Sequence, residues 1–181
     1  MIPILTRDLL LNMLLGLTAL VVLVLAQINP VAKSSEETKP PGSIAVMITW
    51  LAGPIDVDLW VSGPGEPIAV GYSNKQGKLW SLLRDDMGTV GDVSPINMEN
   101  AFARATPAGE YFVNIHGYSL PGGTVPVYAE VSLNGRLLVK TTMDLQPKQE
   151  RTVIRFRLDG EGRLIEGSEN RVFKPLREVG K

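Results

Sequence analysis

Four aspartates in two short segments form the strongest candidate for binding chemistry in this sequence. Asp56 and Asp58 begin a strand-like run, and Asp85 and Asp86 open a polar loop that ends in glycine. Calcium takes about six to eight oxygen ligands, and carboxylates from two loops at one end of a β-sandwich could supply several of them. Aspartates at strand starts and turns also cap loops by accepting hydrogen bonds from backbone N–H groups. The four residues therefore predict either a calcium site or loop bracing.

The sequence offers no other arrangement typical of catalysis. It has no cysteine and a single histidine, His116, which excludes thiolate chemistry and a multi-histidine metal site within one chain. The segments Gly71–Ser73 and Gly117–Ser119 lack the second glycine of a nucleophile elbow. His116 lies in a tyrosine-rich strand, where a packed or hydrogen-bonded structural role is expected. We therefore predict that the chain is not an enzyme.

Trp60 is the aromatic residue that we expect at a binding surface. In the segment DVDLWV, alternation places the three apolar residues on one face and Trp60 with the two aspartates on the other. An exposed tryptophan can stack on a sugar, whereas a buried one supplies core area. The polar side of this strand therefore predicts an exposed Trp60.

Asp8 and Asn12 are polar residues at the start of a long apolar run. At 3.6 residues per turn they share a face with Gly16 and Ala19, and the opposite face is leucine and valine. Small residues let helices pack closely, and asparagine can hydrogen-bond across such an interface. An acid at membrane depth is a candidate functional site. The alternatives are an interfacial pair with Arg7 or an N-cap of the helix.

The apolar run Leu9–Ile28 must position these side chains. Its twenty residues carry no charge, and as a helix they span about 30 Å, the thickness of a bilayer's hydrocarbon core. Cleavage of a signal peptide after Ala26 is the alternative, but the run is longer than the usual apolar core of a signal peptide. We predict that residues 1–28 form a retained transmembrane helix with a cytoplasmic N-terminus.

Beyond the helix, the composition and the hydrophobic period change. Residues 29–42 are rich in proline, serine and charge, which is typical of a flexible linker. Residues 43–160 alternate with a period of two, which predicts an antiparallel β-sandwich of the jelly-roll or immunoglobulin-like type with a hairpin turn at Asn134-Gly135. Residues 161–181 form a polar tail that is either disordered or docked on a partner. The predicted strands are 43–51, 56–61, 67–72, 78–83, 110–117, 125–133, 136–143 and 151–157, and the pattern weakens between 84 and 105.

The helix resembles that of the ion-carrying subunits of membrane motors. Arg7–Asn12 and the apolar run after them carry the resemblance. The families are the B-type flagellar stator subunits (MotB-like) and the ExbD- and TolR-like proteins. The resemblance implies that Asp8 accepts and releases the ion with support from Asn12, and that two such helices sit inside a ring of a multi-pass MotA-, TolQ- or ExbB-like subunit. The chain lacks the OmpA-like domain of the flagellar subunits.

Residues 46–134 resemble a group of bacterial exported β-domains. The shared motifs, in chain order, are DVDLWV, GPGEP, the Tyr-Ser-Asn-Lys run, RDDMG and PAGEYFVNIHGY. Members with a similar N-terminal helix accompany channel-type motor subunits. The resemblance implies a β-domain in the periplasm of a bacterium, tethered to the inner membrane.

Together, these features predict a non-enzymatic, single-pass inner-membrane subunit of a multi-subunit, ion-driven complex. The expected partners are membrane lipid, a channel-type subunit and a second copy of the chain, and the β-sandwich would engage a partner or envelope component. The net charge of −1, with charges interspersed, argues against nucleic acid as a partner. The alternative is a membrane-tethered module, calcium-dependent or not, that recognises glycan or protein.

Overall fold

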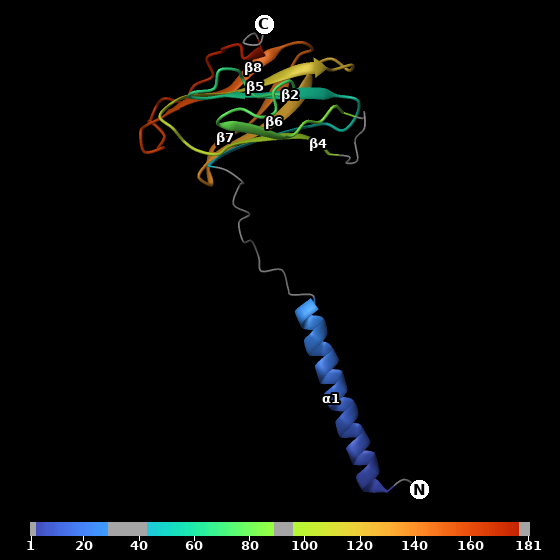
Figure 1. Cartoon of the computed structure of the whole chain (residues 1–181). Coiled ribbons are helices and arrows are strands. Elements are labelled where there is room, and N and C mark those ends of the chain that lie inside the picture. The colour runs from blue at the N-terminus through green and yellow to red at the C-terminus, as the bar shows by residue number, and fades with distance from the viewer. Residues whose placement is uncertain (1–2, 29–42, 89–95, 178–181) are drawn as a thin grey trace. The chain divides into compact units, whose positions relative to one another are not determined.

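The computed structural model describes residues 3–28, 43–88 and 96–177, and the chain forms two compact units that divide after residue 38. The first unit is one helix, α1 (Ile4–Ile28), and the second is built of β-strands (Figure 1). The predicted linker, residues 29–42, lies outside the described residues. The predicted class, one apolar N-terminal helix followed by an antiparallel β-sandwich, is confirmed.

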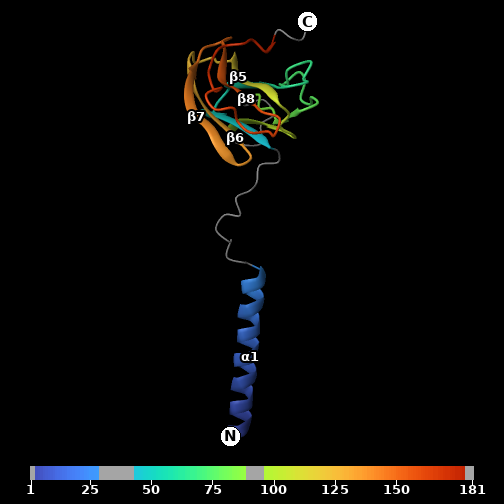
Figure 2. The same cartoon turned by 90° about the vertical axis from the view of Figure 1, so that its left-hand side faces the viewer.

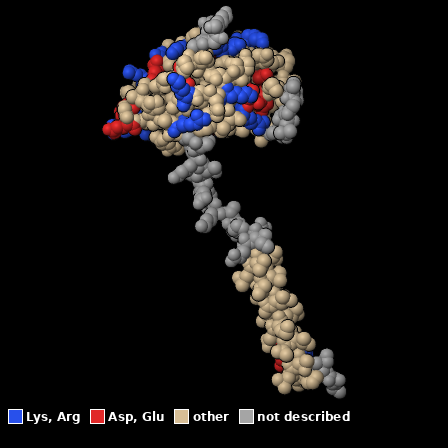
Figure 3. All heavy atoms as spheres, viewed as in Figure 1, with Lys and Arg blue, Asp and Glu red and all other residues tan. Residues whose placement is uncertain are grey.

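The helix is apolar except for a few polar residues, of which the charged ones, Arg7 and Asp8, lie near its N-terminal end. Residues Ile4–Leu25 are long and apolar enough to cross a membrane, and all of their side chains are exposed in the isolated chain. Figure 3 shows charged side chains only near the N-terminal end of this helix. An exposed apolar surface of this length needs lipid or other helices around it.

The β-domain consists of two antiparallel sheets packed face to face, and the two layers are visible in Figures 1 and 2. One sheet has the strand order β3-β4-β1-β6-β7 and the other β2-β5-β8. The strands are β1 (Ile44–Trp50), β2 (Asp56–Ser62), β3 (Trp80–Arg84), β4 (Asn97–Ala103), β5 (Gly109–Ser119), β6 (Val125–Leu133), β7 (Arg136–Leu145) and β8 (Glu150–Leu158).

The core lies between the sheets, where alternation predicted it. The apolar face of β2, formed by Val57, Leu59 and Val61, is fully buried. Tyr111 of β5 stacks on Phe156 of β8, with 5.1 Å between the ring centroids. Such aromatic pairs add packing energy to the burial of apolar area. The face of β2 that carries Trp60 therefore points away from this core.

One predicted strand does not form, one strand was not predicted, and one turn prediction is confirmed. The predicted strand 67–72 forms only isolated bridges, Val61 with Val70 and Gly71 with Asn74. The region 84–105, expected to be a loop, contains β4. Asn134-Gly135 joins β6 to β7 as predicted, with φ of 50° and 79°, the left-handed conformation that this turn requires.

Candidate functional site

Asp8 lies in the second turn of α1 and therefore inside the apolar span. The helix begins at Ile4, where the N–H groups of Thr6 and Arg7 donate to the Pro3 carbonyl at 3.0 and 3.2 Å. The N-cap interpretation of Asp8 is wrong, because an N-cap residue precedes the first helical turn. Within residues 3–28, the Asp8 carboxylate has no hydrogen bond or ion pair, so a pair with Arg7 is not observed either.

The polar face of α1 offers room for another helix. Asn12, Gly16 and Ala19 follow Asp8 at helical spacing, and all are exposed. A Cβ built on Gly16 would meet no atom within 4 Å, so nothing in the described helix fills the space beside it. The hydroxyl of Thr18, in contrast, is satisfied within the helix by the Leu14 and Leu15 carbonyls at 3.0 and 2.8 Å. Asp8 and Asn12 make no side-chain hydrogen bond within the described residues, and both lie on the face with the small residues.

The four aspartates predicted as a cluster interact electrostatically, because the charges of three of them act on the pKa of the fourth, Asp56. The pKa of Asp56 is raised to about 6, first by burial and then by the negative charges of Asp58, Asp85 and Asp86. The geometry agrees, because the carboxylate of Glu99 accepts hydrogen bonds from both segments, from the Leu59 N–H and from the Asp86 N–H.

Each of the other three aspartates is engaged within the fold. Asp58 Oδ2 lies 2.8 Å from His116 Nδ1, and Asp85 pairs with Lys75 at 2.8 Å. Asp86 accepts hydrogen bonds from the Arg84 guanidinium and from two backbone N–H groups. Among the described residues, no group of three or more acidic or histidine side chains is arranged to hold a metal ion. This geometry favours loop bracing, and the calcium site stays a prediction.

The raised pKa of Asp56 gives a testable pH dependence. The carboxyl loses its proton near its usual pKa of 3.8 in the unfolded chain but only near about 6 in the folded one. The folded state therefore binds more protons between these values, and its stability falls as the pH rises from about 4 to about 6.

We expect Asp56→Asn to remove this loss and to raise the free energy of unfolding at pH 7 by about 1 kcal/mol, after allowance for solvent screening. Urea titrations of the wild-type and Asp56→Asn chains at pH 4 and pH 7, followed by tryptophan fluorescence, measure the free energy of unfolding. All three tryptophans lie in the β-domain, so the signal reports on that domain alone. A substitution that lowers stability at pH 7 would contradict the assignment.

A buried glutamate that the sequence analysis missed completes this end of the domain. Glu99 lies on β4, only 1% exposed, and its Oε2 accepts the Leu59 N–H from β2 at 2.7 Å. Its Oε1 accepts the Asp86 N–H at 3.3 Å. Burial raises the pKa of Glu99 well above its usual range. Glu99 therefore joins the two sheets through a polar contact inside the core.

His116 is buried, and both of its ring nitrogens are occupied. Nδ1 faces Asp58, and Nε2 lies 2.7 Å from Nη1 of Arg177. A guanidinium can only donate, so Nε2 accepts and the neutral ring carries its proton on Nδ1, which donates to Asp58. The arrangement agrees with the predicted structural role of His116.

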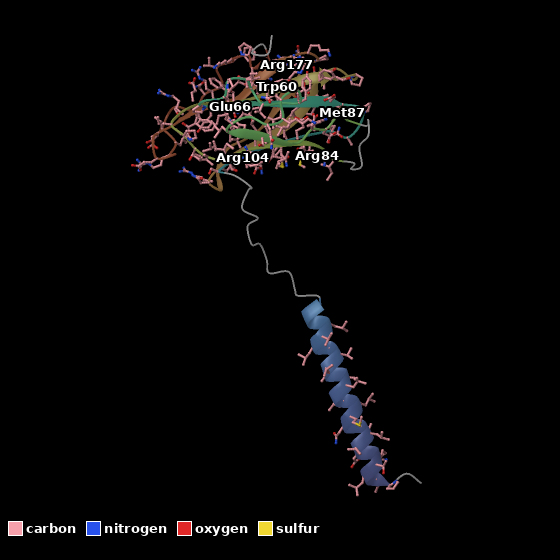
Figure 4. The ribbon with its side chains drawn as sticks, viewed as in Figure 1. Trp60, Glu66, Arg84, Met87, Arg104 and Arg177 are labelled. Atoms are coloured by element: carbon pink, nitrogen blue, oxygen red, sulfur yellow. The ribbon has the colours of Figure 1, made fainter. Side chains whose placement is uncertain are left out.

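Trp60 is only 5% exposed, so the prediction of an exposed Trp60 is wrong. Alternation placed it correctly on the side away from the core, but residues 170–177, which we call the strap, cover that side. Trp60 packs with Ala69, Phe112 and Leu176 of the strap in a second apolar cluster. Figure 4 shows Trp60 and Arg177 in the layer formed by β2, β5 and β8.

The tail was expected to be disordered or docked on a partner, and its described part, residues 161–177, is ordered on the chain's own β-domain. Asn170 exchanges two backbone hydrogen bonds with Arg155 of β8, and Leu176 is buried.

A comparison with known protein families, with curated proteins and with solved structures finds no match for this chain. The resemblances of the helix and of the β-domain therefore stay predictions.

Proposed function

We propose that the chain is a non-enzymatic, single-pass subunit of an ion-driven complex in the bacterial inner membrane. Its N-terminus is cytoplasmic, its β-sandwich is periplasmic, and Asp8 carries the ion. One observation carries the proposal: the Asp8 carboxylate stands in the second turn of a 25-residue apolar helix without a partner in the described chain. A charge within such a span is costly unless it is paired, hydrated or neutralised, and we infer that a second protein or an ion neutralises it.

The chemistry of Asp8 follows from its surroundings. A carboxylate that binds a proton or a cation becomes neutral, and release of that ion restores its charge. The amide of Asn12, one turn on, can donate to the ionised form or accept from the protonated form. Asp8 and Asn12 therefore form a site that can exist in two states of charge within one helix.

The same face of the helix indicates the kind of partner. Gly16 and Ala19 let another helix approach closely, and polar groups at such an interface hydrogen-bond across it. We infer a pair of these helices surrounded by a multi-pass channel-type subunit, with the remaining leucine and valine surface toward that subunit and lipid. The β-sandwich would engage an envelope component.

A substitution on the packing face tests this arrangement. We expect Gly16→Leu to reduce recovery of the partner subunit about ten-fold, because a large side chain fills the space that close helix packing needs. Val21→Leu, on the opposite face, is the matched control and should leave recovery unchanged. Equal recovery with both variants, measured by quantitative immunoblot, would show that Gly16 is not at an interface.

The experiment that tests the proposed function is purification of the tagged full-length chain from its own host in mild detergent. Mass spectrometry would identify the partners and their stoichiometry. The proposal predicts a multi-pass subunit in molar excess over this chain. Recovery of this chain alone, at wild-type abundance, would overturn it and leave Asp8 as an interfacial residue.

A further inference from the structure

Exposed aliphatic side chains gather at one end of the β-domain. Trp50 at the end of β1 and Asn97 at the start of β4 are register partners, so the residues just beyond them, Leu51 and Ile96, lie at the same end. β3 runs antiparallel to β4 and ends toward the start of β4, which brings Leu83 and the loop after β3 to this end as well. Figure 4 shows Met87 of that loop toward the same end of the β-domain. We call four residues the apolar tip, and they are 56–61% exposed: Leu51, Leu83, Met87 and Ile96.

The apolar tip contains most of the strongly exposed apolar side chains of the described β-domain. Five large apolar side chains of this domain are 56% or more exposed, and four of them form the tip, while the fifth, Val172, lies in the strap. Single exposed apolar residues are normal on a soluble domain, but a group of them in one place indicates a contact surface. The tip carries only leucine, isoleucine and methionine, whereas the hot spots of protein interfaces are enriched in tryptophan, tyrosine and arginine. A lipid surface therefore fits the tip better than a protein does.

The carbonyl groups of the loop after β1 are paired within the domain. Asn97 Nδ2 donates to the Leu51 and Gly53 carbonyls at 2.8 and 3.2 Å. Trp50 Nε1 donates to the Ile55 carbonyl at 2.8 Å. A carbonyl that already has a donor loses little when water leaves it, whereas an unpaired one costs several kcal/mol in an apolar medium. This loop can therefore approach a lipid surface without leaving these carbonyls unpaired.

The other two segments of the tip are braced in the same way. Arg84 Nη2 donates to the Ile96 carbonyl at 2.8 Å. The Asp86 carboxylate accepts the Gly88 N–H at 3.1 Å and the Met98 N–H at 3.0 Å. The aliphatic side chains therefore stand on a framework whose polar groups bond inward, which is the arrangement that insertion into an apolar phase requires.

The charges next to the tip are paired as well. Asp86 pairs with Arg84 at 2.8 Å, and Asp85 pairs with Lys75 at 2.8 Å. The pKa of Asp56, which follows the loop after β1, is raised to about 6, first by burial. A surface of this kind is expected to bind lipid through its apolar side chains, without a requirement for charged headgroups. Neutral phosphatidylcholine is therefore the lipid with which to test it.

A bilayer that holds α1 lies within reach of the tip. The helix ends at Ile28 and β1 begins at Ile44, and the chain between these two residues extends to at most about 50 Å. The tip lies beyond the other end of β1, about 23 Å from Ile44 at the rise of a strand. The connecting chain is therefore long enough for the tip to touch the bilayer that anchors the protein. A tether of this length also keeps the bilayer at a high effective concentration, so that a weak contact is populated.

We propose that the apolar tip inserts into the surface of the bilayer that anchors α1. Lipid is the occupant because the tip is aliphatic, its polar backbone groups bond inward, and the tether brings a bilayer within its reach. Burial of the aliphatic side chains among the acyl chains supplies the favourable free energy. This inference goes beyond the proposed ion-driven function and rests only on the anchoring of α1 in a membrane, so it holds whether or not Asp8 carries an ion.

Quenching of a single fluorophore by lipid tests the insertion. The chain has no cysteine, so Ile96→Cys places one environment-sensitive NBD label on the tip. Leu137→Cys is the matched control, because Leu137 is also exposed and lies near the opposite end of the same sheet. Each labelled full-length chain is reconstituted in phosphatidylcholine vesicles with and without a nitroxide quencher on the acyl chains. We expect blue-shifted, strongly quenched emission at position 96 and little quenching at position 137, whereas equal quenching at both positions would overturn the proposal.

Substitutions elsewhere on the tip test whether the contact is apolar. Leu51→Ser together with Leu83→Ser should lower the ratio of inserted to free tip at least about ten-fold, because the apolar area buried in lipid falls. The change is read as loss of quenching at position 96. Leu137→Ser is the control and should leave the quenching unchanged. Where Ile96→Cys lowers folding, Met87→Cys carries the label on a different loop and is expected to give the same result.

The same assay separates lipid insertion from the proposed function, because it uses the chain without its co-purified subunit. Asp8→Asn should leave the quenching at position 96 unchanged, since the tip does not depend on ion transfer. Quenching in the chain alone therefore supports insertion even where ion flux is absent. If position 96 becomes shielded only when the co-purified subunit is added, with no quenching by lipid, the tip binds protein and the proposal fails.

Discussion

Asp8→Asn is expected to abolish the function of the chain while leaving its abundance and its assembly unchanged. Asparagine has nearly the shape of aspartate, but it cannot gain and lose a proton or balance the charge of a cation. A neutral side chain in the apolar helix also costs less to insert than a charged one, so the substitution removes the site without harming the helix. Complementation of a strain that lacks the chain, with immunoblots of the membrane fraction, measures both effects.

Two matched variants separate the carboxylate from a general effect on the helix. Asp8→Glu keeps an ionisable group one methylene further out and is expected to retain part of the activity. Arg7→Gln removes the neighbouring charge and should remain active. Full complementation by Asp8→Asn would exclude ion transfer through Asp8, whatever the other two variants do.

Glu99→Ala is expected to have the largest effect on the stability of the β-domain, lowering its free energy of unfolding by about 3 kcal/mol. The alanine leaves the buried Leu59 N–H without its acceptor and opens a cavity at the contact between the two sheets. Urea titration of the full chain in mild detergent, followed by tryptophan fluorescence, measures the change.

Glu99→Gln should cost less than Glu99→Ala, about 1 to 2 kcal/mol, because glutamine keeps one oxygen acceptor and has no charge to bury, but its NH2 group leaves either the Leu59 or the Asp86 N–H without an acceptor. The pKa of Glu99 is raised by burial, so its contribution to stability falls as the pH rises above its usual range. The Glu99→Gln substitution should remove this decrease of stability with rising pH. Glu130→Ala, on a strand of the same sheet, is the matched control, with an expected change of about 0.5 kcal/mol. Equal losses for alanine and glutamine at position 99 would contradict the proposed hydrogen bond.

Alternation predicted most of the sandwich because most inward-facing residues are apolar. It failed at β4, where Asn97 and Glu99 point inward and Met98 lies between them. With polar residues on the core side, the period-two pattern is inverted, and a strand cannot be told from a loop by hydrophobicity. The compensating hydrogen bonds come from residues far away in the sequence, such as Leu59.

The candidate sites were predictable to different degrees. The grouping of Asp56 with Asp85 follows from their places at the ends of strands. The face of Trp60 was also predictable, but what covers that face was not, because Arg177 lies 61 residues beyond its partner His116. Alternation fixes the side of a sheet on which a residue lies, whereas burial depends on long-range packing.

Ion flux through the purified complex tests the central claim most directly. The full-length chain and its co-purified subunit would be reconstituted in vesicles, and entry of protons and of sodium would be measured in turn with fluorescent indicators. We predict flux of one of these ions with the wild-type chain and a fall to the protein-free level with Asp8→Asn. Equal flux with both chains would show that Asp8 does not carry the ion.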